Sequence, residues 1–343
     1  MTDTLHIRIV GSAGQISLTR ADALNALTRE MIRQIRRAIA SFNENPQIDV
    51  ILLDAEGDRA FCAGGDLSSI YRAGKTGNFS AGQDFWAEEY RMNLEIATSR
   101  KPVVSFMHGF VMGGGIGLGC HAALRIAAPD AVFAVSQVKV GLAPDAGASF
   151  LLALSPGRMG EYLGATGRRF GAADAVWLGF ADRVIARADW PRLKALLSGG
   201  AGLDAIPEGI EGASGLSMIA PAVDAQFGGE SLADIWRALL KDTTPFGHDC
   251  RELLGKVSPL AASAAIEMLH RLGEGWPMDR ALGLEYRFAY RAQENGDLLE
   301  GIRAVIIDKD QSPKWRHDGP DTVAAVETAR MLMPLGPAEW RAE

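Results

Sequence analysis

The segments RAFCAGGD, at residues 59–66, and HGFVMGGGIGLG, at residues 108–119, carry the strongest structural signal in this chain. Each follows a short apolar run, VILLD at 50–54 or VVSFM at 103–107, of the kind expected for a strand buried on both faces. Glycine lacks a Cβ, so its backbone N–H can approach a ligand closely. Two such N–H groups directed at one carbonyl oxygen would stabilise an oxyanion, which is a large term in acyl chemistry.

A tight turn against a neighbouring helix also favours glycine, and either segment alone fits such a turn better than a ligand site. The combination, with Asp66 and a strand before each segment, favours the ligand site. The stretch 113–119 lacks the G-x-G-x-x-G spacing of dinucleotide-binding proteins, and neither G-x-x-x-x-G-K-S/T nor G-x-S-x-G occurs in the chain. The sequence therefore supports neither a nucleotide-binding motif nor a serine nucleophile elbow.

The composition is that of a globular protein. With 343 residues, 48% of them hydrophobic and 22% charged, the chain is long enough for one large domain and an appended smaller one. The net charge of -7 argues against a nucleic-acid partner. No apolar run approaches the roughly 18 residues of a membrane span, and the opening MTDTLHIRIV alternates like a strand rather than a secretory signal. We therefore expect a cytoplasmic protein that has no membrane partner.

Neither the cysteines nor the histidines predict a metal site. Cys62, Cys120 and Cys250 lack metal-ligand spacing, and we expect them to be reduced thiols. His108 and His121 lack the close i, i+4 spacing of a helical metal pair and have no third ligand nearby.

The order of the elements predicts an α/β fold. Residues 6–10 and 15–20, joined by GSAG, form a predicted β-hairpin. Thr28 is placed to cap a helix that ends before Pro46. Because apolar strands then alternate with helices, we expect βαβ units whose sheets are covered by helices.

Composition divides the chain into three parts. A core of residues 1–195 precedes a glycine-rich, partly helical linker region at 196–230. The remaining residues, 231–343, are mostly helical in pattern, and Ser258 before Pro259 fits a helix start with proline in the first position.

The glycine segments resemble those of the crotonase (enoyl-CoA hydratase/isomerase) superfamily. More narrowly, QVKVGLAPDAG at 137–147 and GIRAVIIDKDQSPKW at 301–315 resemble the 3-hydroxyisobutyryl-CoA hydrolase branch. The resemblance implies a crotonase-type ββα spiral core with a helical C-terminal region. It also implies an acyl-CoA substrate, with CoA as part of the substrate and no separate cofactor. Superfamily members commonly form trimers or hexamers, so a homo-trimer or hexamer is the expected assembly.

The resemblance implies that two backbone N–H groups bind the oxygen of the reacting carbonyl. The N–H groups of Gly65 and Gly114 would polarise the thioester carbonyl oxygen. Glu89, in AEEYRMN, matches a substrate-contacting glutamate of the hydrolase branch. A solvated helix residue is the alternative interpretation of that glutamate.

The resemblance also places CoA. The RADALNA loop at 20–26 would hold it, with Arg20 near the phosphates. Backbone groups around Ala63, Asp66 and Leu67 would contact the adenine. An ordinary surface arginine is the alternative interpretation of Arg20.

The carboxylates expected for catalysis are only partly present. Hydratases of the superfamily use two glutamates that flank a water, and the matching positions here hold Gly117 and Gln137. The hydrolase branch accepts glycine at the first position, uses glutamate at the second as base or nucleophile, and adds an aspartate eight residues later. This chain keeps that aspartate as Asp145, but Gln137 is neutral and can only orient a water or hydroxyl. Losing a general base typically costs about 10² to 10⁴ in rate.

Three interpretations of Gln137 stay open. Asp145 can take over as base or nucleophile, as an aspartate does at about this place in the aryl-CoA dehalogenase branch. Glu89 can reach the water instead, or the glutamine is an inactivating change. A purely structural role for Asp145, capping a turn or helix after Pro144, is a further alternative.

The predicted function is hydrolysis of a short β-hydroxyacyl-CoA thioester, 3-hydroxyisobutyryl-CoA by resemblance, in valine catabolism. Gly65 and Gly114 would polarise the carbonyl, and Asp145 would contact the β-hydroxyl or assist the water. One alternative is an enoyl-CoA hydratase or isomerase. The other is an acyl-CoA-binding homologue without turnover, which Gln137 favours.

Overall fold

A computed structural model describes residues 4–273 and 275–342 of the chain. Contacts divide the chain into two compact units, each built from separated segments. The first comprises the chain up to Gly65, Glu88–Phe133 and Phe170–Ser217, and the second comprises Asp66–Ala87, Ala134–Arg169 and the chain from Met218 onward. The three-part division at 195 and 230 follows composition rather than contacts, and it stays a prediction.

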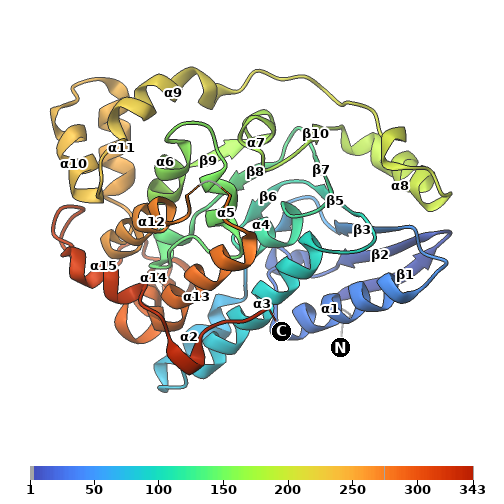
Figure 1. Cartoon of the computed structure of the whole chain (residues 1–343), viewed down its shortest axis with the longest axis horizontal. Coiled ribbons are helices and arrows are strands. Elements are labelled where there is room, and N and C mark those ends of the chain that lie inside the picture. The colour runs from blue at the N-terminus through green and yellow to red at the C-terminus, as the bar shows by residue number, and fades with distance from the viewer. Residues whose placement is uncertain (1–3, 274, 343) are drawn as a thin grey trace. The chain divides into compact units, whose positions relative to one another are not determined.

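The described residues form two sheets (Figure 1). The six-stranded sheet has the order β1-β2-β3-β5-β7-β10, and the four-stranded sheet has the order β4-β6-β8-β9. The strands are β1 (Leu5–Val10), β2 (Ala13–Leu18), β3 (Val50–Ala55), β4 (Ala60–Cys62), β5 (Val103–Met107), β6 (Phe110–Met112), β7 (Leu124–Ala127), β8 (Val132–Ala134), β9 (Arg169–Gly171) and β10 (Arg183–Val184).

The chain winds as a spiral between these sheets. From β3 to β8, successive strands alternate between the two sheets, so each turn of the chain adds one strand to each. The β1–β2 pair is antiparallel and forms the predicted hairpin, with Leu5 opposite Leu18. The pairs β2–β3, β3–β5, β5–β7, β7–β10 and β4–β6 are parallel. This winding confirms the predicted α/β spiral.

The helices, in chain order, are α1 (Arg29–Glu44), α2 (Leu67–Lys75), α3 (Ser80–Ala97), α4 (Gly114–Gly119), α5 (Ala148–Ala153), α6 (Met159–Thr166), α7 (Ala172–Leu178), α8 (Trp190–Ser198), α9 (Gly215–Gln226), α10 (Leu232–Lys241), α11 (Pro245–Leu254), α12 (Pro259–Arg271), α13 (Met278–Asn295), α14 (Leu298–Ile302) and α15 (Ala325–Met331). Among the described residues, none of these helices is both long and apolar enough to cross a membrane.

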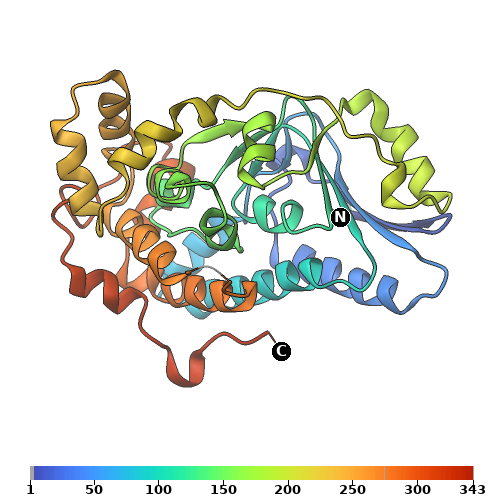
Figure 2. The same ribbon diagram turned by 45° about the horizontal axis from the view of Figure 1, so that its top comes forward.

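Two helices of the first unit cover opposite faces of the six-stranded sheet (Figure 2). α1 begins at Thr28, whose side chain accepts a hydrogen bond from the Met31 N–H at 3.2 Å, as predicted. The Phe42 ring of α1 packs directly on Gly14 of β2, where a Cβ would lie only 2.4 Å from the ring. On the other face, Leu193 of α8 joins a buried cluster with apolar side chains of β3 and β5.

The second unit is mostly helical, and its described residues after 231 carry helices α10 to α15, as the fold class predicted for the C-terminal region. α12 starts as expected, because the Ser258 side chain accepts a hydrogen bond from the Ala261 N–H at 3.1 Å and Pro259 occupies the first turn. The Ser258 hydroxyl also donates to the Asp297 carboxylate at 2.6 Å. Ser258 therefore caps α12 and also hydrogen-bonds Asp297, the residue that precedes α14.

Candidate active site

The RADALNA loop of the first unit is held in one conformation by its own residues. Leu24 and Asn25 both have positive φ, 52° and 54°. The buried Asn25 amide donates to the carbonyl oxygens of Glu56 at 3.0 Å and Ala60 at 2.9 Å, and this fixes a backbone shape that non-glycine residues rarely adopt. Asn25 was not predicted to have this role, although asparagine is among the residues that best tolerate this conformation.

Two guanidinium groups donate hydrogen bonds to backbone carbonyl oxygens of this loop. Arg20, predicted to lie near the CoA phosphates, donates to the Ala26 carbonyl oxygen at 3.0 Å. Arg59 donates to the Ala21 carbonyl oxygen at 3.3 Å. Arg59 is therefore a second cation at the loop, and it was not predicted as a CoA-binding residue.

The loop is hydrogen-bonded to the first glycine segment. The Ala63 N–H donates to the Leu24 carbonyl oxygen at 3.0 Å, and the Leu27 N–H donates to the Gly64 carbonyl oxygen at 2.8 Å. The structure thus brings the predicted CoA loop and Ala63 together.

The two glycine segments lie against each other in the first unit. A Cβ on Gly113 would lie 3.3 Å from the Gly64 Cα, and both glycines have positive φ, 51° and 118°. Among the described residues, neither the Gly65 N–H nor the Gly114 N–H donates to a backbone carbonyl oxygen. Gly65 is partly exposed, whereas Gly114 is buried.

Glu89 is buried beside Gly114, with 2% of its surface exposed. A Cβ on Gly114 would lie 2.2 Å from the Glu89 Oε1, so only glycine leaves room for the carboxylate. Burial raises the pKa of the nearby Cys62 thiol to about 12, and the negative charge of Glu89 adds to that rise. The alternative of a solvated helix residue is therefore wrong.

The position of the first hydratase glutamate is filled from another helix. A Cβ on Gly117 would lie 2.6 to 2.8 Å from the amide atoms of Asn93, a fully buried residue of α3. With its amide oriented to satisfy hydrogen bonding, Asn93 donates to the carbonyl oxygens of Gly117 and Glu89 at 3.3 Å. A glutamate at position 117 would have to displace this amide.

In the second unit, Asp66 and Leu67 lie at the start of α2. Asp66 occupies the N-cap position, and its carbonyl oxygen accepts from the Ser69 hydroxyl at 2.7 Å. Leu67 is the first residue of the helix. Their backbone is thus fixed at a helix N-terminus, where the dipole and the first N–H groups favour contact with an anion or a polar ring atom.

Gln137 and Asp145 form a buried pair in the second unit. The Gln137 Nε2 donates to the Asp145 Oδ1 at 2.7 Å, and the residues are 6% and 5% exposed. This orientation of the amide requires Asp145 to present an unprotonated oxygen. The Gln137 Oε1 is buried without a partner among the described residues. A buried acceptor of this kind indicates a missing donor, such as a water or a substrate hydroxyl.

A buried carboxylate that was not predicted, that of Glu285, contacts the turn after Asp145. Glu285 of α13 accepts hydrogen bonds from the residues that follow Asp145, the Gly147 N–H at 2.8 Å and the Ser149 N–H at 2.9 Å. It lies 138 positions from Gly147, so no local pattern could have indicated the contact.

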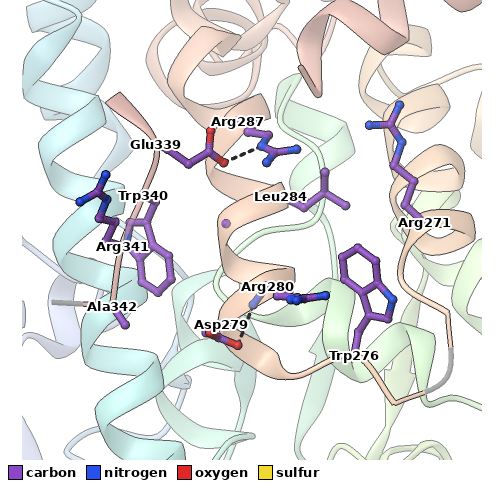
Figure 3. A pocket seen from close by; sticks show the side chains of 11 residues that line it. Arg271, Trp276, Asp279, Arg280, Leu284, Arg287, Glu339, Trp340, Arg341 and Ala342 are labelled. Atoms are coloured by element: carbon purple, nitrogen blue, oxygen red, sulfur yellow. Dashed lines mark hydrogen bonds and ion pairs between the residues drawn. The ribbon is translucent and has the colours of Figure 1, made fainter. Parts of the chain in front are cut away.

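A pocket of the second unit, with a volume of about 620 Å³, contains none of these residues (Figure 3). Its lining includes Arg280, whose guanidinium lies 5.5 Å from the centre of the Trp276 ring. Arg287 donates to the Glu339 carboxylate at 2.6 Å across the same pocket. These side chains already contact one another. Among the described residues, no group of three or more histidine, cysteine or acidic side chains is placed to hold a metal ion.

The sequence matches the enoyl-CoA hydratase/isomerase family over residues 13–332. It is 35% identical over 330 residues to the mitochondrial 3-hydroxyisobutyryl-CoA hydrolase of Danio rerio, a match that covers 92% of this chain and 85% of that protein. The corresponding protein of Homo sapiens is 31% identical over 319 residues, covering 89% of this chain and 82% of that protein.

Solved structures show the same likeness. A structure named an enoyl-CoA hydratase from Rhodobacter sphaeroides 2.4.1 has a TM-score of 0.96 and 47% identity, and the match covers 99% of this chain and 100% of that one. A structure named a carnitinyl-CoA dehydratase from Mycobacterium thermoresistibile has a TM-score of 0.92 and 31% identity, with 100% and 99% covered. This chain therefore belongs to the enoyl-CoA hydratase/isomerase, or crotonase, family.

Proposed function

We propose that this protein hydrolyses a short β-hydroxyacyl-CoA thioester such as 3-hydroxyisobutyryl-CoA, a reaction of valine breakdown. The hydrogen bond between Gln137 and Asp145 carries the proposal, because it joins the glutamine to the one carboxylate that the motif keeps, in a buried place. The relatives named 3-hydroxyisobutyryl-CoA hydrolases, 31% and 35% identical over most of the chain, support the substrate class.

In this proposal the N–H groups of Gly65 and Gly114 bind the thioester oxygen. Negative charge builds on that oxygen as the tetrahedral intermediate forms, and N–H groups that donate to no backbone carbonyl oxygen of the described residues can stabilise it. Loss of one such donor typically costs about 10² to 10³ in rate. The buried Glu89, fixed beside Gly114, is assigned to substrate contact.

Asp145 is assigned as the general base. Its carboxylate takes a proton from water while the water oxygen bonds to the thioester carbon. The C–S bond then breaks, the sulfur takes up a proton, and the products are the hydroxy acid and CoA. Gln137 positions the reactants, since its Nε2 donates to Asp145 and its unpaired Oε1 accepts from the water or the β-hydroxyl.

CoA is assigned to the RADALNA loop. Arg20 and Arg59, which both contact carbonyl oxygens of that loop, supply positive charge for the phosphates. The backbone of Ala63, Asp66 and Leu67 supplies hydrogen bonds for the adenine. A cytoplasmic location and a homo-trimer or hexamer stay predictions.

An acyl-CoA-binding protein without turnover is the second candidate, and Gln137 is the observation that favours it. Hydration of an enoyl-CoA is less compatible with the site, because Asn93 fills the space beside Gly117 and Gln137 cannot transfer a proton. One solved structure that is 47% identical to this chain is named an enoyl-CoA hydratase. The test therefore also has to measure hydration of an enoyl-CoA.

The test measures thiol release from 3-hydroxyisobutyryl-CoA by the purified protein. We expect release by the wild type, at least about 10²-fold slower release by Asp145→Asn, and no change in Asp130→Asn, an exposed aspartate used as a matched control. Tight binding of the CoA ester without thiol release would establish the second candidate instead. Hydration of crotonyl-CoA without thiol release would establish a hydratase.

A further inference from the structure

We propose that Glu285 is a positioning residue that fixes the turn carrying Asp145, and thereby holds that carboxylate against Gln137. The inference rests on the proposed hydrolysis, in which Asp145 is the base. Glu285 does not touch the reacting atoms in this scheme. It acts through the backbone of the residues between Asp145 and α5.

The contacts of Glu285 all go to this turn. Its Oε2 accepts from the Gly147 N–H at 2.8 Å, and its Oε1 accepts from the Ser149 N–H at 2.9 Å. The Ser149 hydroxyl also donates to Oε1, at 2.5 Å. Both oxygens of one side chain, only 1% exposed, are thus committed to three donors within three residues.

The turn needs such a support. Ala146 and Gly147 both have positive φ, 58° and 78°, and for alanine this conformation costs free energy. Gly147 is also the N-cap residue of α5 and has no side chain to accept from the first helical N–H groups. The Glu285 carboxylate supplies that acceptor from α13, so one residue stabilises both the strained backbone and the start of the helix.

The geometry connects this support to the base. Asp145 immediately precedes the strained residue Ala146, and its carbonyl oxygen accepts from the Ala148 N–H at 3.0 Å. A change of backbone angle at Ala146 would therefore move the Asp145 side chain away from Gln137. A displacement of about 1 Å in a reacting group can cost about 10²-fold in rate.

Burial also raises the pKa of the Glu285 carboxyl. Removal from water raises the pKa of its carboxyl to about 8, and the negative charge of Asp145 contributes to that rise. A carboxyl protonated on Oε1 can exchange donor and acceptor roles with the Ser149 hydroxyl and still accept from both backbone N–H groups. The contact therefore survives in either protonation state.

The test compares Glu285→Gln and Ser149→Ala with Glu161→Gln as the matched control. Glu161 is a buried glutamate of α6 whose carboxylate contacts Arg158 at 2.7 Å rather than this turn. Glutamine at 285 keeps the size of the side chain but turns an NH₂ group toward one backbone N–H. Ser149→Ala removes one of the three contacts and leaves the two backbone bonds in place.

We expect Glu285→Gln to lower kcat for thiol release about 10- to 100-fold with KM within about twofold. Ser149→Ala should have a smaller effect and Glu161→Gln none on kcat. Amide hydrogen exchange should accelerate at Gly147 and Ser149 in Glu285→Gln. A general loss of stability would instead accelerate exchange throughout α5 and α6.

The outcomes separate this inference from the proposed function. An active wild type with unchanged kcat in Glu285→Gln, or with equal losses in Glu285→Gln and Glu161→Gln, overturns the positioning role alone. A wild type that binds the CoA ester but releases no thiol overturns the proposed function. Glu285 would then have no role in catalysis. Unchanged exchange at Gly147 and Ser149 in Glu285→Gln overturns the structural basis of the inference in either case.

Discussion

Replacing Gln137 by glutamate introduces a second carboxylate at a known distance from the first. Amide and carboxylate have nearly the same shape, so a carboxylate oxygen takes the place of Nε2, 2.7 Å from the Asp145 Oδ1. Both residues are buried, which limits the screening of their charges by water. Two carboxylates so close cannot both ionise without a large cost.

The cost follows from the separation of the two charges. The charge of each carboxylate is shared by two oxygens, so the charge centres lie roughly 4 Å apart, and at an effective dielectric constant of about 20 the repulsion is about 4 kcal/mol. This corresponds to about 3 pKa units. The pair in Gln137→Glu should therefore hold one shared proton until the pH approaches about 7, whereas ordinary carboxyls lose theirs near pH 4.

The sign of the stability change follows from linkage. A carboxyl whose folded pKa exceeds its unfolded pKa stabilises the folded state fully below the unfolded value, and this contribution is lost as the pH rises through the folded value. Relative to wild type, Gln137→Glu should lose little stability at about pH 4 and about 4 kcal/mol above about pH 8. Urea unfolding at both pH values measures the difference.

The same variant should hydrolyse 3-hydroxyisobutyryl-CoA about 10² to 10⁴ times faster than wild type at about pH 7.5. Its rate should rise with an apparent pKa near 7 that belongs to the pair. Adding Asp145→Asn to Gln137→Glu removes the repulsion, so the rising limb should move to lower pH. A stability difference that is the same at both pH values would show that the two side chains are not neighbours, and it would refute the reasoning.

Three further substitutions test the rest of the site. Gly114→Ala places a methyl 2.2 Å from the Glu89 Oε1, and we expect thiol release to fall about 10²-fold in a steady-state assay. Gly117→Glu collides with Asn93, and urea unfolding should show a loss of about 1–3 kcal/mol without any gain of crotonyl-CoA hydration. Asn25→Ala removes two buried donors, so we expect a loss of about 2–4 kcal/mol in unfolding and a raised KM for the CoA ester.

The features that the sequence predicted correctly depend on neighbours in the chain. The caps at Thr28 and Ser258 and the β1–β2 hairpin each follow from a few consecutive residues. The buried strands follow from short apolar runs. The α/β class follows from their order, but the choice of a spiral over a doubly wound sheet required the family resemblance.

The features that the sequence did not predict depend on contacts between distant segments. Asn93 and Gly117 come from two helices, and only their packing shows that a glutamate has no room at position 117. The contact of Glu285 with Gly147 joins residues 138 positions apart. Neither Asn93 nor Glu285 stands out in its own helix, where asparagine and glutamate normally face solvent. The spacing of apolar residues along a helix predicts which face of that helix is buried. It cannot predict which polar residue becomes buried by contact with a segment far away in the sequence.

The pairing of Gln137 with Asp145 changes the chemistry that the motif can perform. In the wild type an amide N–H faces the Asp145 oxygen, whereas Gln137→Glu places a second carboxylate there that repels the first. An amide can orient the neighbouring carboxylate but cannot exchange a proton with it. If Asp145 acts alone as the proposed base, the wild type should release thiol more slowly than Gln137→Glu at neutral pH. Its pH–rate profile should also lack the limb near pH 7 that comes from the shared proton of the variant's pair.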